Sequence, residues 1–124
     1  MSTIKYNKLV RDRIPEIIEA SGKRCVCSTL SDEEYLAKLD EKLNEELAEY
    51  QESKSMEELA DLLEVIRAVA VARGSSMEEV EAIRRDKAAK RGGFEKKIWS
   101  ESIRSLPFAA APVSRMPSWK HRSA

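Results

Sequence analysis

Residues 45–61 read EELAEYQESKSMEELAD, and this stretch decides how the rest of the chain is arranged. Its two ends are rich in Glu, Leu and Ala, as helices are, and a short polar break at residues 51–54 separates them. The break is short enough for a second helix to fold back along the first. We therefore predict an all-α fold, a helical bundle built on an antiparallel pair of long helices.

The same stretch carries two pairs of carboxylates, each with a three-residue spacing. Residues three apart on a helix lie on neighbouring points of one face, so each pair can close on one cation. Folding the second helix back along the first would bring both pairs together across the helix contact. The carboxylates are those of Glu46, Glu49, Glu58 and Asp61.

Such a cluster is costly without a positive partner, because like charges within a few ångströms raise one another's pKa and resist burial. A hard divalent cation is the usual remedy. Mg²⁺, or Mn²⁺ in its place, takes oxygen ligands, and Mg²⁺ normally keeps several waters and works together with substrate phosphates. The pattern therefore indicates Mg²⁺-dependent phosphate chemistry.

Length and composition limit the class of protein. The chain has 124 residues, enough for one domain with a proper core, and 35% of them are charged with a formal net charge of zero. Nucleic-acid-binding domains are usually distinctly basic, so we expect no polymeric nucleic-acid partner. No apolar run approaches the roughly 18 residues that span a bilayer, and no signal-peptide pattern opens the chain. We expect a cytoplasmic protein that does not bind membranes.

Capping patterns and apolar spacing predict the other elements. A short helix is expected over residues 12–20, and a β-like run at residues 24–30 indicates an extended connector. Ser-x-x-Glu capping boxes then begin three longer helices. We expect these helices to start after Ser31, Ser55 and Ser76 and to end near Tyr50, Arg73 and Arg91.

The sequence changes character after the last helix. Gly92 and Gly93 stop the helix, and we expect the large apolar side chains that follow to anchor a short terminal element. These anchors are Phe94, Ile98 and Trp99. Residues 104–124 are rich in Pro, Ser and Ala, which predicts a flexible tail behind a domain of residues 1–103.

An apolar stripe on the first long helix indicates which glutamates face inward. The stripe consists of Leu36, Leu39, Leu43, Leu47 and Tyr50. At roughly 100° per residue, with Leu43 as the reference, Glu46 falls near the edge of the stripe and Glu49 somewhat further round. Glu45 lies almost opposite. We expect Glu46 and Glu49 to point inward and Glu45 to lie in a supporting or surface position.

Glu58 has a second explanation, because the last residue of a capping box can reach back with its side chain to the amide of Ser55. Asp61 lies too far inside the expected helix for its side chain to cap the first turn, and Asp is a mediocre residue in a helix interior. Capping alone therefore leaves Asp61 unexplained.

The basic residues also have two interpretations. Lys8, Arg11 and Arg13 form either a solvated basic face or a contact to phosphate. Lys90 and Arg91 suit the negative end of a helix dipole without any ligand. The sequence alone leaves both interpretations open.

Together these motifs resemble those of a known superfamily. Glu45-Glu46-x-x-Glu49 followed by Glu58-x-x-Asp61 resembles the signature of the MazG-like all-α nucleoside triphosphate pyrophosphatases, which include phosphoribosyl-ATP pyrophosphohydrolase. The opening YNKLVRDRIPEII at residues 6–18 and the closing KRGGF at residues 90–94 resemble its small phosphoribosyl-ATP-pyrophosphohydrolase-like branch, a branch with a predicted house-cleaning role. The gap between Glu49 and Glu58 is shorter than in many MazG-type members, which also favours the compact branch.

The resemblance implies roles for particular residues. The metal ligands would be Glu46, Glu49, Glu58 and Asp61. Glu45 or Glu49 would orient or deprotonate the attacking water. The candidates for contacting the nucleotide's phosphates are Lys8, Arg11, Lys87, Lys90 and Arg91. The resemblance also implies a homodimer or a higher homo-oligomer.

The implied activity is Mg²⁺-dependent hydrolysis of a nucleoside triphosphate between its α- and β-phosphates, giving a monophosphate and pyrophosphate. Hydrolysis of phosphoribosyl-ATP is the alternative within the same bond class. An alternative from another class is a non-catalytic helical interaction protein, in which the Glu-rich flanks are solvated and the apolar stripes build a dimer.

Overall fold

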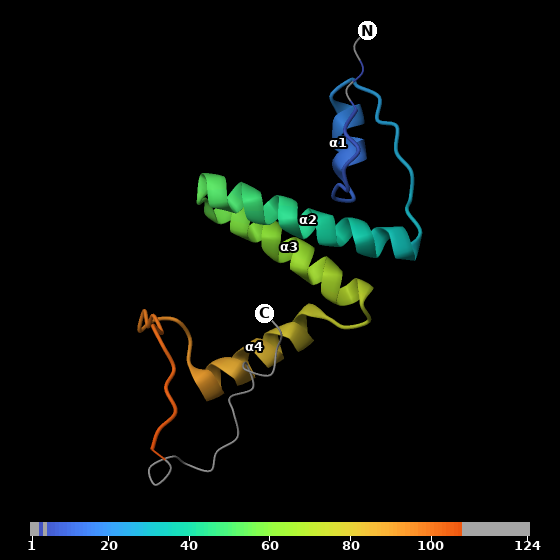
Figure 1. The fold of residues 1–124 in the computed structure, drawn as a ribbon. Coiled ribbons are helices and arrows are strands. Elements are labelled where there is room, and N and C mark those ends of the chain that lie inside the picture. The colour runs from blue at the N-terminus through green and yellow to red at the C-terminus, as the bar shows by residue number, and fades with distance from the viewer. Residues whose placement is uncertain (1–2, 4, 108–124) are drawn as a thin grey trace. The chain divides into compact units, whose positions relative to one another are not determined.

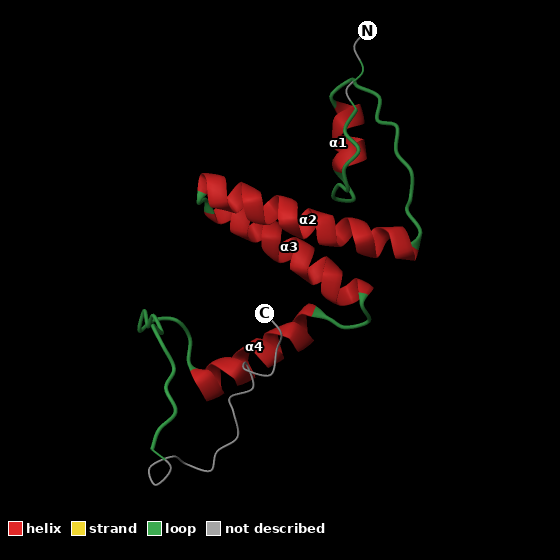
Figure 2. Cartoon of the chain, in the orientation of Figure 1, coloured by secondary structure: helices red, strands yellow, loops and turns green. Residues whose placement is uncertain are grey.

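Four helices make up the regular structure of the described residues (Figure 1). The computed structural model describes residues 3 and 5–107, and within them it contains no strand (Figure 2). In chain order the helices are α1 (Ile14–Ala20), α2 (Asp32–Ser53), α3 (Met56–Ala72) and α4 (Met77–Arg91). The prediction of an all-α fold is confirmed.

The pair α2–α3 is shaped by local signals at each helix end. Ser31 caps α2, because its Oγ accepts a hydrogen bond from the Glu34 amide at 3.2 Å. α2 ends where Lys54 adopts a left-handed conformation with a φ of 58°. Ser55 follows at once and caps α3. Because Lys54 and Ser55 are the whole connection, α3 folds back along α2 (Figure 1).

The polar break is shorter than predicted. α2 continues through Gln51 and Glu52 to Ser53, past the end expected near Tyr50. Gln and Glu have good helix propensity, so the polar character of these residues does not stop the helix. The left-handed backbone of Lys54 stops it instead.

The core of the described residues is small. Its buried apolar side chains are Leu39 of α2 with Val65 and Ala70 of α3. Leu39 is 3% exposed, whereas Leu47 on the same predicted stripe is 42% exposed. The α2–α3 contact therefore covers only part of the apolar faces that the sequence carries.

The first helix begins later than predicted. α1 begins at Ile14 rather than near Asp12, with Pro15 in its first turn, and ends at Ala20 as predicted, with Ser21 as its C-cap before Gly22, whose φ is 90°. Residues 24–30 have no secondary structure, and Val26 among them is almost fully exposed. The β-like composition of this run finds no strand to pair with in the described part of the chain.

The predicted cap of the third long helix is present, although the Glu79 side chain accepts from the Ser75 hydroxyl rather than from the Ser76 amide. The Ser76 Oγ accepts a hydrogen bond from the Glu79 amide at 3.1 Å, and α4 then runs to Arg91. Gly92, with a φ of 83°, takes the left-handed conformation that ends the helix. The packing contact of α4 is with α3.

By its internal contacts the chain divides into two units, Met1–Arg91 and Gly92–Ala124. In the second unit Phe94 is 97% exposed, and Ile98 and Trp99 are nearly as exposed. The prediction that these side chains anchor a terminal element is wrong for the described residues, where residues 92–107 form only a turn closed by the Lys97 amide on the Phe94 carbonyl. Most of the predicted tail, including Phe108 and Trp119, lies outside the described residues.

None of the described helices has both the length and the apolar character that crossing a membrane requires.

Leu39 and Leu47 allow a matched test of the core. Leu39→Ala should lower the free energy of unfolding by about 2–5 kcal/mol, because it opens a cavity between α2 and α3. Leu47→Ala should cost about 1 kcal/mol or less, because this side chain is already half in water. Urea unfolding followed by circular dichroism measures both. Equal losses would show that Leu47 is covered in solution.

Candidate metal centre

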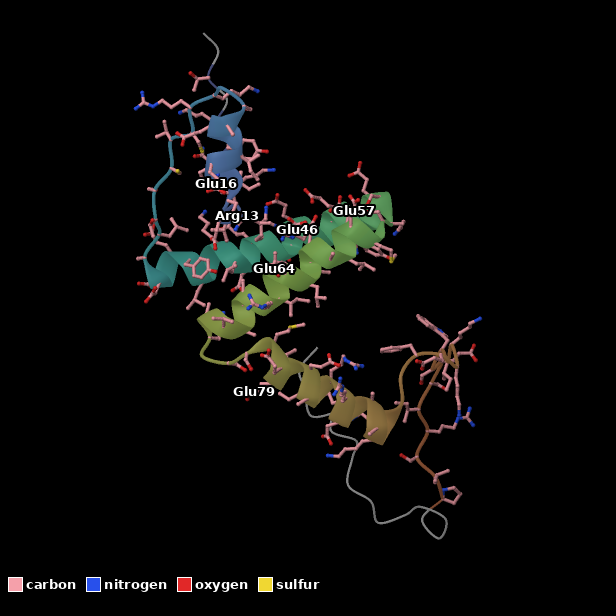
Figure 3. The ribbon with its side chains drawn as sticks, turned by 180° about the vertical axis from the view of Figure 1, so that it is seen from behind. Arg13, Glu16, Glu46, Glu57, Glu64 and Glu79 are labelled. Carbon is pink, nitrogen blue, oxygen red and sulfur yellow. The ribbon has the colours of Figure 1, made fainter. Side chains whose placement is uncertain are left out.

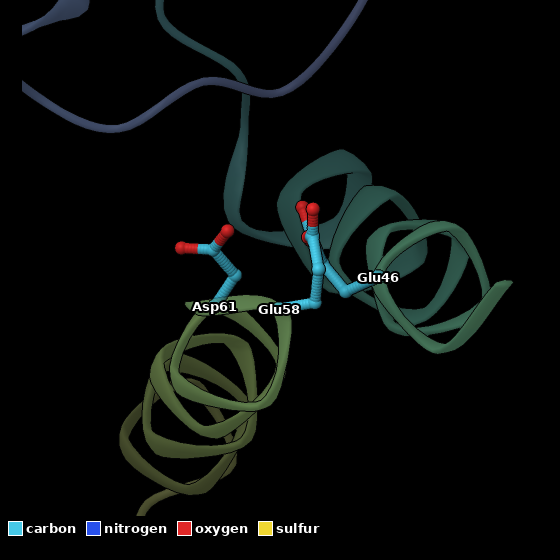
Figure 4. Close-up of side chains that lie close together, drawn as sticks. All are labelled: Glu46, Glu58 and Asp61. Atoms are coloured by element: carbon cyan, nitrogen blue, oxygen red, sulfur yellow. The ribbon is translucent and has the colours of Figure 1, made fainter. Parts of the chain in front are cut away.

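Three carboxylates meet where α2 and α3 are in contact (Figure 4). Glu46 comes from α2, and Glu58 and Asp61 come from the first turns of α3. One oxygen of each lies within 4.8 Å of the others, close enough to share one cation. The hairpin thus brings together one member of the first predicted pair and both members of the second.

Glu46 is the buried member of this cluster. Only 6% of the residue is exposed. Its Oε1 lies 3.4 Å from the Lys42 Nζ, whereas its Oε2 has no hydrogen-bond partner. A buried acceptor without a partner loses its hydration and gains nothing in exchange, which costs about 1–3 kcal/mol.

The hydrogen bonds around Ser55 decide between the two explanations of Glu58. The Glu58 amide donates to the Ser55 Oγ at 3.3 Å, so the backbone half of the capping box is present. The Ser55 amide donates instead to the Ser53 Oγ, also at 3.3 Å. The side chain of Glu58 therefore does not complete the capping box, and its buried Oε2 has no hydrogen-bond partner.

Burial and mutual repulsion disfavour the ionised forms of both glutamates. Burial raises the pKa of Glu46, and the nearby carboxylate of Glu49 raises it further, against the effect of Lys42. Burial also raises the pKa of Glu58, and the charges of Glu49 and Asp61 add to the rise. Glu49 thus acts on both glutamates, although its carboxylate is not among the three that lie within 4.8 Å of one another.

Arg11 supplies a positive charge at the edge of the cluster. Its Nη2 donates to the Asp61 Oδ1 at 2.7 Å, and both side chains are about half exposed. Arg11 belongs to the irregular segment before α1, so this contact ties the N-terminal segment to α3. Arg11 thus has a carboxylate partner, and its contact with phosphate stays a prediction.

Two lysines hold Glu45 beside the cluster. The Glu45 Oε1 lies 3.4 Å from the Lys8 Nζ and 3.2 Å from the Lys42 Nζ. Burial would raise the pKa of Glu45, but the lysines outweigh it and the pKa is lowered. Glu45 is therefore ionised, and both lysines engage the same one of its oxygens.

Lys42 has a role that the sequence analysis missed. It contacts both Glu45 and Glu46, three and four residues further along α2. These contacts raise the pKa of Lys42 against the effect of burial, which lowers it. The i,i+4 spacing to Glu46 was the sequence signal that could have found it.

A groove of about 630 Å³ adjoins the cluster. It lies between the residues just before α1 and the α2–α3 pair, and its lining includes Arg13 and Glu46. Figure 3 shows Arg13 near α1 and Glu46 on α2. Its volume falls in the range of sites for small ligands. Nothing in the sequence indicated this groove, because it depends on where the N-terminal segment packs.

The structure does not bring the predicted cations of α4 to this cluster. Lys90 pairs with Asp86 within α4 at 3.0 Å, and neither Lys87, Lys90 nor Arg91 lines the groove. α4 follows the far end of α3, about 16 Å of helix beyond Asp61 at 1.5 Å per residue. Their contact with phosphate stays a prediction.

Comparisons with known proteins add little about function. No protein-family model and no solved structure matches the chain. A stretch of 42 residues, 34% of this chain, is 67% identical to a protein of Mycolicibacterium smegmatis that is described as uncharacterized. This stretch covers 43% of that relative's length. The MazG-like resemblance therefore stays a prediction from the motifs.

The raised pKa values predict how stability depends on pH. Because their pKa values are raised, Glu46 and Glu58 bind protons more readily in the folded chain than in the unfolded chain. The free energy of unfolding of the metal-free protein should therefore fall as the pH rises from 4.5, the ordinary pKa of both groups, through their raised pKa values. Above this window Glu46→Gln should raise the free energy of unfolding by roughly 1 kcal/mol, because it removes a charge from the cluster.

Urea unfolding in a chelator, from acidic to neutral pH, measures this effect. Glu41→Gln is the matched control, because Glu41 is an exposed residue of the same helix whose surface ion pair contributes little. If the free energy of unfolding depended on pH in the same way for Glu46→Gln and for the wild type, the charge of Glu46 would not be a source of the repulsion.

Proposed function

We propose that the carboxylate cluster binds a divalent cation, Mg²⁺ or alternatively Mn²⁺, and that the protein hydrolyses nucleoside triphosphates between the α- and β-phosphates. The products would be a nucleoside monophosphate and pyrophosphate. One observation carries the proposal: Glu46 and Glu58 each have a buried carboxylate oxygen without a hydrogen-bond partner, and both residues belong to the cluster that Asp61 completes. A bound cation would supply the missing partner.

The residues present suit a hard cation. Every oxygen of the cluster belongs to a carboxylate, and neither a histidine nor a cysteine takes part in it. Oxygen ligands favour Mg²⁺ or Mn²⁺ over Zn²⁺, which more often takes nitrogen and sulfur. Glu46, Glu58 and Asp61 would hold the ion, with Glu49 as the fourth ligand.

A bound divalent cation neutralises phosphate oxygens and makes a water more acidic, which is the chemistry that this reaction needs. The chain's own residues would do the rest. Glu49 is better placed than Glu45 to accept the proton of the attacking water, because two lysines already engage Glu45. Lys8 and Arg11 would stabilise charge that develops on the phosphates.

The position of Arg11 supports its role with phosphate. It reaches the cluster from the N-terminal segment and remains about half exposed while bound to Asp61. A guanidinium binds carboxylate and phosphate oxygens with the same planar donors, so Arg11 can exchange one for the other. Lys8 lies in the same segment and meets the cluster through Glu45.

Exposed apolar side chains favour self-association. Self-association is expected both for the enzyme and for the alternative, a non-catalytic interaction protein. Leu47, Leu59 and Leu63 of the hairpin are exposed, so a second copy would have an apolar surface to cover. This surface does not explain two buried carboxylate oxygens without partners. We therefore place the enzyme first and propose a homo-oligomer.

A product-resolved assay tests the reaction class. Nucleoside triphosphates, ordinary and modified, and phosphoribosyl-ATP are incubated with the protein in Mg²⁺ or in chelator. Monophosphate and pyrophosphate should appear only with metal. Glu46→Gln should lower turnover by roughly a hundredfold or more, because several kcal/mol of charge stabilisation depends on the ligand set.

Glu41→Gln is again the control and should retain wild-type turnover. Metal-independent turnover, or wild-type turnover in Glu46→Gln with unchanged Mn²⁺ affinity, would remove the cluster from the mechanism. No turnover on any substrate would favour the interaction protein.

Arg11→Ala separates phosphate contact from metal binding. It should weaken nucleotide affinity about tenfold through the loss of a charge-assisted hydrogen bond. Mn²⁺ affinity should not fall, because Asp61 loses a competing partner. Arg24→Ala is the control, since Arg24 is an exposed arginine of the loop before α2. Isothermal titration with an uncleavable nucleotide analogue measures both affinities, and unchanged nucleotide affinity would exclude the contact.

A further inference from the structure

Two basic side chains of the irregular segment before α1 reach carboxylates of the hairpin. The Arg11 Nη2 lies 2.7 Å from the Asp61 Oδ1, and the Lys8 Nζ lies 3.4 Å from the Glu45 Oε1. Asp61 belongs to the carboxylate cluster. We call residues 8–13 the basic segment. Its positive charge lies where the proposed cation would bind.

Ionic contacts are an important part of what holds the basic segment to the hairpin. The helix that follows it, α1, has no buried residue and packs against none of the other described helices. Within the segment Leu9 and Val10 are half-buried, whereas residues 11–13 are exposed. Loss of the ionic contacts would therefore leave few apolar contacts to keep the segment in place.

The contact of Arg11 with Asp61 is weak enough to be exchanged. It consists of one hydrogen bond, from Nη2 to Oδ1, and the two side chains are 58% and 42% exposed. A guanidinium that donates two parallel hydrogen bonds to a carboxylate is held more firmly. Ion pairs as exposed as this one contribute little, because water screens them. Another cation can therefore displace Arg11 at a modest cost.

A divalent cation and Arg11 would repel each other at this site. Both would bind the carboxylate of Asp61, so a doubly charged ion would lie within a few ångströms of the guanidinium. Lys42 adds positive charge, since its Nζ lies 3.4 Å from the Glu46 Oε1. Lys42 belongs to α2 and stays near the cluster as long as this helix is intact. Arg11 belongs to an irregular segment, so it is the group that can leave.

We propose that the basic segment competes with the cation: Arg11 pairs with Asp61 in the metal-free protein, and a divalent cation displaces it and releases the segment from the hairpin. This inference rests on the proposed metal site and adds regulation to it. The guanidinium becomes available to a phosphate only after the cation has bound. By linkage, the cation weakens the docking of the segment by the same factor by which docking weakens cation binding.

Isothermal titration with Mn²⁺ tests the competition. Arg11→Gln should bind Mn²⁺ about fivefold more tightly than the wild type, because a half-exposed ion pair no longer competes. Arg13→Gln is the matched control, since Arg13 is an exposed arginine of the same segment and the change in charge is the same. Its Mn²⁺ affinity should stay within about twofold of the wild type.

The sign of the change decides the role of Arg11. Unchanged Mn²⁺ affinity in Arg11→Gln, or an equal gain in Arg13→Gln, would overturn the competition at Asp61. Weaker binding would also overturn it, and would show instead that Arg11 positions Asp61 for the ion.

Limited digestion with trypsin tests the release of the segment. In the wild type, saturating Mn²⁺ should speed cleavage after Lys8, Arg11 and Arg13 about fivefold, because cleavage follows the population of the released segment. Cleavage after Arg24, in the exposed loop before α2, should not change. In Arg11→Gln, cleavage after Lys8 and Arg13 should be fast with and without Mn²⁺. Digestion of casein with and without Mn²⁺ controls for an effect on the protease.

The outcomes separate this inference from the proposed metal site. Mn²⁺ binding that leaves cleavage of the basic segment unchanged overturns the release, while the metal site stands. Measurable Mn²⁺ binding by Arg11→Gln but not by the wild type upholds the competition. If neither protein binds Mn²⁺, or if the effect of Mn²⁺ on cleavage persists in Glu46→Gln, both the metal site and the displacement are overturned.

Discussion

The contact between α2 and α3 forces carboxylates together, and this constraint governs the other features of the molecule. Glu46 is buried in the contact, and Glu58 meets it from the facing helix with an oxygen that also lacks a partner. Glu46 is buried and Glu58 is half-buried, so water offsets their repulsion only in part. Positive groups lie at the cluster's edges: Lys42 on the same helix contacts Glu46, and Arg11 from the N-terminal segment contacts Asp61.

The hairpin and most of the carboxylate cluster were predictable because their signals are local. Ser31, Ser55 and Ser76 each begin a helix through a hydrogen bond to an amide three residues on, and a sequence reader sees that spacing directly. A three-residue spacing on a helix likewise fixes Glu58 and Asp61 on one face. The end of α2 was misplaced because it depends on the backbone conformation of Lys54, which composition does not reveal.

The rest depends on contacts between segments distant in sequence. Arg11 and Asp61 are 50 residues apart, and no local pattern distinguishes an arginine that reaches a carboxylate from one that is solvated. The groove shares this origin, because one of its sides is the segment before α1. The apolar residues after Gly93 show the opposite error: Phe94 and Trp99 resemble core residues by type, yet both are largely exposed, and residues 92–107 around them form no helix or strand.

Dividing the ligands between two helices links cation binding to the register of the hairpin. If α3 slipped by one turn along α2, Glu58 and Asp61 would be displaced by about 5 Å relative to Glu46. The three carboxylates would then lie too far apart to bind one ion. The small apolar core resists such a slip only weakly, since Leu39, Val65 and Ala70 are its buried side chains among the described residues. A cation held by both helices would stabilise this register, by an amount that grows with the logarithm of the cation concentration above its Kd. The cluster that is expected to weaken the metal-free fold would then stabilise the metal-bound one.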